Sequence, residues 1–171
     1  MKSSKFLWIT GVLGTLCILG ALYLSFYKVQ APTVSDIKVV SDSLEIKRHA
    51  EISIGQGTSS TTIMADVADT EALQERGLGG RTTMTENQGM FFVFSIPEPY
   101  GFWMKDMFIP IDIIWLDKNL KVIYIKEDVS PSTYPESFAP KTPALYVLEV
   151  ASGFSSRHNV KIGDTIKVWY K

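Results

Sequence analysis

The chain has 171 residues, enough for one domain and an additional segment but few for two domains. Its 17 basic and 18 acidic residues give a net charge of -1, a balance that excludes the strongly basic surface typical of nucleic-acid-binding proteins. The single cysteine, Cys17, lies in an apolar run, and the chain has only two histidines, so we expect no disulfide, no metal site and no cofactor.

Residues 6–27 (FLWITGVLGTLCILGALYLSFY) contain no charged side chain and are predicted to form a transmembrane anchor. A helix of this length spans a bilayer core of about 30 Å, and aromatic residues near both ends suit the membrane interface. Lys2 and Lys5 precede the run, which predicts that residues 1–5 are cytoplasmic and the C-terminal part extracytoplasmic. A cleaved signal peptide is the alternative, because VQA at 29–31 is similar to a cleavage site.

Residues 28–43 mix proline, serine and isolated charges without hydrophobic periodicity, which is typical of a tether. The remaining residues, 44–171, are predicted to form one extracytoplasmic domain. Its first part alternates between apolar and polar residues in LEIKRHAEISI and TTIMADV, which predicts two strands around a GQG turn. DTEALQERG then predicts a helix of about two turns, capped by Asp69 or Thr70 and ended by Gly77.

Short strands dominate the rest of the domain. GMFFVF and FWMKDM are predicted strands, and IDIIWL and KVIYIKE are predicted to form a hairpin across DKN. A proline-marked loop, residues 130–143, is long enough for a binding or lid role. ALYVLEV is a predicted strand, GFSSRHN a helical turn, and KIGDTIKVWY a turn into the last strand. We therefore expect a mainly β (α+β) domain with a compact antiparallel sheet or barrel and one or two short helices.

Five sequence blocks follow one another along the chain: ERGL at the helix end, GMFFVF, FWMK followed by IPIDI, YVLE and a final GD turn. In these blocks the chain resembles the domain of unknown function 192 family over roughly residues 60–170. It departs from the family pattern at Gly79, where a larger residue such as methionine is usual, and at Asp106, where asparagine is usual. The family has no established reaction, so the resemblance implies no catalytic residue.

The densest apolar run outside the first 27 residues, GFWMKDMFIPIDIIWLD at 101–117, contains charged residues. If 102–109 is a strand, Trp103 and Lys105 share one face and are candidates for contact with an anionic or sugar-like ligand. Asp112 lies between isoleucines just after Pro110. There it is expected to be buried and to accept backbone N–H groups or pair with an arginine, although it could instead form the polar floor of a pocket.

Arg81 follows the glycine-rich GLGG, where backbone amides and a guanidinium could hold an anion, although such a stretch is more often a helix stop and a turn. The ligand-binding candidates are thus Arg81, Trp103, Lys105 and Asp112. We expect a membrane-anchored binding or interaction module for a small ligand or an envelope protein, without catalytic activity of its own. The alternatives are a purely structural partner of another membrane protein and an envelope hydrolase using Asp112 or Glu127 with Lys105 and Arg81.

Overall fold

The computed structural model describes residues 45–46, 48–55 and 60–171. The expected transmembrane anchor and the whole of the expected tether lie outside these residues. Within the described part, no helix combines the length and the apolar character needed to cross a bilayer.

The described residues form a mainly β structure with two short α-helices. The strands are β1 (His49–Ile54), β2 (Thr61–Ala68), β3 (Gln88–Glu98), β4 (Phe102–Trp103), β5 (Ile111–Leu116), β6 (Val122–Val129), β7 (Ser137–Phe138), β8 (Ala144–Ala151) and β9 (Lys167–Tyr170). The helices are α3 (Glu71–Arg76) and α4 (Phe154–Arg157), and a 3-10 turn, η2, spans Pro131–Thr133.

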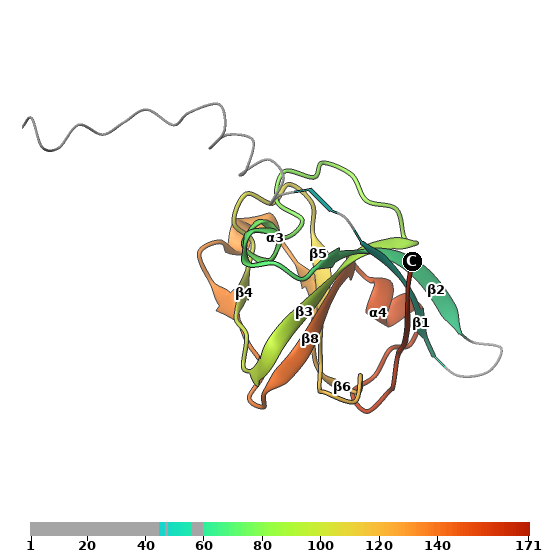
Figure 1. The fold of residues 1–171 in the computed structure, drawn as a ribbon. Helices are drawn as coiled ribbons and strands as arrows, with labels where there is room; N and C mark the ends of the chain where they lie inside the picture. The colour runs from blue at the N-terminus through green and yellow to red at the C-terminus, as the bar shows by residue number, and fades with distance from the viewer. Residues whose placement is uncertain (1–44, 47, 56–59) are drawn as a thin grey trace, which may run out of the picture. The chain divides into compact units, whose positions relative to one another are not determined.

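Seven strands form one sheet in the order β6-β5-β8-β3-β2-β1-β9, while β4 and β7 form a separate two-stranded ribbon (Figure 1). All neighbouring strands in the large sheet are antiparallel except β2 and β3, which are parallel. The prediction of an antiparallel sheet is therefore wrong for this one pair. The chain between β2 and β3 includes α3 and returns to the starting end of the sheet, as a parallel connection requires.

Backbone hydrogen bonds join the two ends of this strand order and make the sheet barrel-like. The residues just before β9 pair with the start of β6: the Val122 amide donates to the Asp164 carbonyl at 2.8 Å and the Gly163 amide to the Val122 carbonyl at 2.8 Å. The Ile166 amide donates to the Leu120 carbonyl at 3.0 Å. These bonds satisfy backbone groups that an open edge strand would leave exposed.

Apolar side chains cover both faces of the central strands β3, β5 and β8. Because successive side chains of a strand point to opposite faces, Phe91 and Phe92 belong to different hydrophobic clusters. The first cluster includes Phe154 of α4 and the second includes Leu73 of α3, and Figure 1 shows these helices on opposite sides of β3 and β8. The β4–β7 ribbon also packs in the second cluster through Phe102 and Phe138 of its two strands.

The helix α3 begins and ends where the sequence predicts. Of the two predicted caps, Thr70 is the one used, because its hydroxyl accepts the Leu73 amide at 3.3 Å. Gly77 ends the helix with φ of 52°, a conformation that glycine adopts without steric cost.

The expected strand over 102–109 is wrong beyond Trp103. Asp106 has φ of 58°, outside the extended region of a regular strand, and its carbonyl accepts the Gly80 amide at 2.9 Å. Trp103 and Lys105 therefore do not share a strand face. After glycine, asparagine and aspartate are the residues that tolerate this left-handed conformation best, so the aspartate at position 106 suits this backbone as an asparagine would.

Asp112 is buried and paired, as predicted. It is 0% exposed, and its two carboxylate oxygens accept three backbone amides, those of Asp128 (2.9 Å), Gly153 (2.9 Å) and Ser155 (2.8 Å). The donors do not belong to the Pro110 corner or to an arginine but to the end of β6 and the start of α4. A carboxylate that accepts three amides has its hydrogen-bonding capacity largely occupied.

Candidate functional site

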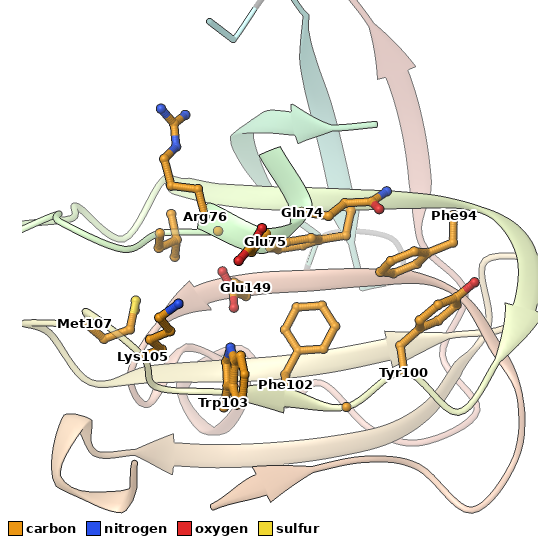
Figure 2. A pocket seen from close by; sticks show the side chains of 14 residues that line it. Gln74, Glu75, Arg76, Phe94, Tyr100, Phe102, Trp103, Lys105, Met107 and Glu149 are labelled. Carbon is orange, nitrogen blue, oxygen red and sulfur yellow. The ribbon is translucent and has the colours of Figure 1, made fainter. Parts of the chain in front are cut away.

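A pocket of about 230 Å³ opens where α3 faces the segment that contains β4 (Figure 2). Its lining comes from α3 and the turn that follows, from β3, from residues 100–107 and from β8. The volume is below the usual range of drug-sized sites, roughly 300–1,000 Å³, so the pocket suits a small organic molecule.

Aromatic rings form much of the pocket wall. Phe94 and Tyr100 stack with ring centroids 3.6 Å apart, and Phe102 meets Phe92 edge to face at 4.8 Å. Behind them, the indole N–H of Trp115 donates to the Tyr100 carbonyl at 2.8 Å and so holds the chain next to β4. The wall is rigid and apolar, which favours the flat face of a ring or an aliphatic body in the ligand.

The Glu149 carboxyl is the most unusual group in the pocket. The residue is only 4% exposed, and its Oε2 atom has no hydrogen-bond partner in the described part of the chain. Burial raises the pKa of the Glu149 carboxyl from 4.5 to about 8, because the opposing effects of the Arg81 charge and the Leu78 amide are smaller. The side chain is therefore mainly neutral at pH 7, and it lies in the centre of the ring of lining residues (Figure 2).

The strands around Glu149 explain why it is buried. In β8 it pairs with Met90 of β3 on one side and Ile113 of β5 on the other, so both cross-strand neighbours are apolar. Gly77 leaves room on the pocket side: a Cβ atom there would lie 3.5 Å from the Phe92 ring and 3.7 Å from Glu149 Oε2. The glycine that ends α3 thus lies beside the Glu149 carboxyl in the pocket lining.

Charged side chains surround the opening. Figure 2 shows the Lys105 ammonium turned toward the Glu149 carboxyl, the Glu75 carboxylate on the α3 side, and the Arg76 guanidinium pointing away from the pocket. Gln74 fixes the helix itself, since its side-chain amide donates to the Val93 carbonyl at 2.8 Å.

The structure brings together only two of the four predicted ligand-binding residues. Trp103 and Lys105 line the pocket, and the ring of Trp103 lies 6.1 Å from that of Tyr134 in the proline-marked loop. Asp112 and Arg81 are not among the lining residues. Asp112 and Glu149 point to opposite faces of the sheet, because Asp112 lies in register with Val150, the residue after Glu149.

Arg81 pairs with the Asp66 carboxylate instead of lining the pocket, and the other oxygen of Asp66 meets the His49 ring at 2.9 Å. Its charge still acts on Glu149, whose pKa it lowers. Glu127 is exposed in β6 and does not line the pocket either. The groups expected for a hydrolase, Asp112 or Glu127 with Lys105 and Arg81, are therefore not assembled at this pocket.

Sequence reasoning missed Glu149, although a signal was present. The residue is the one charged side chain in the strand sequence ALYVLEV, which is otherwise almost entirely apolar. A lone carboxylate in an apolar strand must find donors or become neutral, the same argument that drew attention to Asp112.

Within the described residues, no group of three or more His, Cys, Asp or Glu side chains is placed to hold a metal ion. The polar residues that line the pocket are Gln74, Glu75, Arg76, Lys105 and Glu149. Together with the aromatic wall they can bind a small molecule by shape, by hydrogen bonds and by the charges of Lys105 and Glu75.

Two crystal structures resemble the described domain. One, from Sinorhizobium meliloti 1021, is of a protein provisionally described as a transcription regulator; it has 23% identity and a TM-score of 0.68, covering 72% of this chain and 95% of that chain. At this identity the similarity concerns the fold alone. The other, a protein of unknown function from Novosphingobium aromaticivorans DSM 12444, has 31% identity and a TM-score of 0.65, covering 70% of this chain and 84% of that chain.

No curated protein matches the chain significantly. The profile of the DUF192 family, described as Uncharacterized ACR, matches residues 52–168. The match extends over more than half of the 171-residue sequence and includes α3, β4 and β8, the elements that build the pocket. The chain therefore belongs to the DUF192 family.

Proposed function

We propose that this protein is a membrane-anchored binding module, displayed on the outer side of the membrane, whose pocket between α3 and β4 takes a small organic ligand. The observation that carries the proposal is the Glu149 carboxyl, buried in the pocket with Oε2 unpartnered. A buried polar atom without a partner costs about 1–3 kcal/mol, and a ligand that supplies the missing hydrogen bond would recover part of it.

The aromatic wall supports the same proposal. Trp103 is 48% exposed beside the pocket, and an exposed indole next to buried aromatic rings is a common feature of sites that bind flat or apolar molecules. The wall is also pre-formed, since hydrogen bonds and ring stacking already hold Tyr100 and Phe102 in place. A pre-formed site loses little conformational entropy when a ligand binds.

The proposed location depends on the N-terminal sequence. Residues 6–27 are uncharged and long enough to span a membrane, and the lysines before them favour a cytoplasmic N-terminus. Residues 28–43 would then give the domain freedom to meet ligands or envelope proteins near the membrane surface.

A screen of small organic fragments by amide chemical shifts tests the binding function. The ¹⁵N-labelled domain, residues 44–171, should show binders that shift the amides of Gly77, Gly101 and Trp103 but not those of the β5–β6 turn. Trp103→Ala should weaken these binders at least several-fold, because it removes a lining ring.

Trp169→Ala is the matched control, because Trp103 and Trp169 are both 48% exposed and only Trp103 lines the pocket. The binding function is refuted if no fragment perturbs the pocket amides, or if the two tryptophan variants weaken binding equally.

A further inference from the structure

The proposed binding function does not specify the ligand. The polar groups of the pocket restrict its chemical class. We propose that the ligand is a small monocarboxylate with an apolar or aromatic body, whose carboxylate accepts hydrogen bonds from the Glu149 side chain and the Lys105 ammonium. This inference rests on the proposed function and adds the chemical class of the ligand.

The open atom of Glu149 defines the first contact. Oε2 has no partner among the residues that the structure describes, whereas the Leu78 amide engages the carboxyl, so Oε2 is the oxygen left for a ligand. It also faces the pocket lining, since it lies 3.7 Å from the position of a Cβ atom on Gly77.

Protonation makes this atom a donor. The pKa of Glu149 is raised to about 8 by burial, so at pH 7 the carboxyl mainly carries its proton. The carboxyl oxygen that accepts the Leu78 amide is less basic, because its lone pair is already engaged. The proton therefore resides on Oε2, which becomes an O–H donor. A neutral O–H forms its strongest hydrogen bond with an ionised oxygen, at roughly 2.5–2.7 Å, so a carboxylate is the best-matched acceptor.

Lys105 supplies one compensating charge. The charged groups near Glu149 are Glu75 on α3, Lys105 after β4 and Arg81 after α3, while the neighbours in β3 and β5 are apolar. Arg81 is already paired with Asp66, and Arg76 points away from the pocket (Figure 2). The Glu75 carboxylate offsets part of the Lys105 charge, so the pocket matches one negative charge better than the two of a phosphate.

The rest of the pocket fits the body of such a ligand. The rings of Phe92, Phe94, Tyr100 and Phe102 offer apolar surface within a volume of about 230 Å³. This surface favours a single aromatic ring or a short aliphatic chain and gives few partners for the many hydroxyl groups of a sugar.

The pH dependence of binding distinguishes these ligand classes. A carboxylate needs Glu149 protonated, because two ionised carboxylates would repel each other. Its affinity should therefore fall about tenfold per pH unit above the Glu149 pKa, which lies at about 8. A neutral amide or a hydroxyl can also donate to the ionised form, so its affinity should not fall in this way.

The test uses benzoate, its neutral isostere benzamide, and glucose, titrated calorimetrically into the full chain in detergent micelles between about pH 6 and pH 9. We expect benzoate to bind more tightly than benzamide at pH 6 and to lose affinity above about pH 8. Glu149→Gln keeps a neutral donor, so benzoate should still bind and the loss above pH 8 should disappear. Lys105→Ala should weaken benzoate about tenfold, and Lys118→Ala, which removes an exposed lysine from the β5–β6 turn, should not.

Each outcome decides between the two proposals. If benzamide or glucose binds in the pocket and benzoate does not, or if benzoate affinity is the same at all pH values, the carboxylate inference is wrong and the binding function stands. If none of the probes binds and the fragment screen is also negative, both proposals are wrong.

Discussion

The carboxylate of Asp112 accepts the backbone amide of Ser155 at 2.8 Å, so a residue of β5 caps α4 from 43 positions away in the sequence. The cap residue of α4 itself, Gly153, has no side chain to do so, and its own amide also donates to Asp112, at 2.9 Å. The first amides of a helix lack partners within the helix, and Asp112 satisfies them from the neighbouring strand.

Asp112→Asn should destabilise the domain clearly. The asparagine amide nitrogen cannot accept the hydrogen bonds that one carboxylate oxygen now receives, which leaves at least one buried amide unpaired at a cost of ~1–3 kcal/mol. Thermal denaturation should show a fall of several degrees in the melting temperature. Lys105→Ala serves as the comparison and should stay within about one or two degrees of the parent, because Lys105 is exposed. An Asp112→Asn variant as stable as the parent would show that the carboxylate is not structural.

Glu149 should make the domain less stable as the pH rises. The folded pKa of about 8 lies above the ordinary 4.5, so between these values the folded state holds a proton that the unfolded state has released. The unfolding free energy therefore falls by ~1.4 kcal/mol per pH unit between the two pKa values. Below the unfolded pKa the contribution of Glu149 to stability is complete, and above the folded pKa it no longer changes with pH. Glu149→Gln removes the effect.

Urea denaturation at about pH 5 and pH 8 measures the difference. The unfolding free energy of Glu149→Gln minus that of the parent should be larger at about pH 8 than at about pH 5, by a few kcal/mol. Glu127→Gln, at an exposed position of β6, should show no comparable change. Parallel pH profiles for the parent and Glu149→Gln would mean that the carboxyl is ionised in the folded protein.

Trp115→Phe should disturb the pocket wall from behind. Trp115 is fully buried, and its N–H donates to the Tyr100 carbonyl at 2.8 Å, so the phenylalanine leaves that carbonyl unpaired and a small cavity in the core. The expected loss of stability is ~1–3 kcal/mol, with several-fold weaker binding of pocket ligands. Trp169→Phe, at a half-exposed position of β9, is the control, and equal effects of the two changes would contradict the role given to Trp115.

Residues from about 44 onward should fold without the preceding segment. A chain of ~130 residues buries roughly two-thirds of the surface that it exposes when unfolded. The two hydrophobic clusters are formed within the described domain. A fragment starting at Leu44 should therefore melt in a single cooperative transition in calorimetry. A broad transition or poor dispersion of amide shifts would show that the core needs the earlier residues.

Residues 6–27 should keep the protein in the membrane. Their apolar length exceeds that of a usual signal peptide, whose apolar region has ~7–15 residues. After alkaline carbonate washing, the full chain should stay in the membrane pellet with its original N-terminus, as read by mass spectrometry. A soluble product that begins near Pro32 would establish cleavage instead.

Local patterns in the sequence were sufficient for most of the elements. Alternation with a period of two residues predicts β1 and β2, short apolar runs predict β3, the β5–β6 hairpin and β8, and a threonine before an acidic first turn predicts α3. The burial and pairing of Asp112 also follow locally, because a carboxylate between isoleucines has to find donors.

Only the tertiary structure decided how these elements meet. The parallel pairing of β2 with β3 depends on where α3 returns the chain, and β4 stops at Trp103 because Asp106 adopts a left-handed turn that contacts Gly80. The pocket combines α3, β4 and β8, which are far apart in the sequence, and its central group is Glu149 and not Asp112 or Arg81. The local sequence predicts that a carboxylate is buried, whereas the donors that it finds and the pKa that it adopts depend on the other segments that bury it.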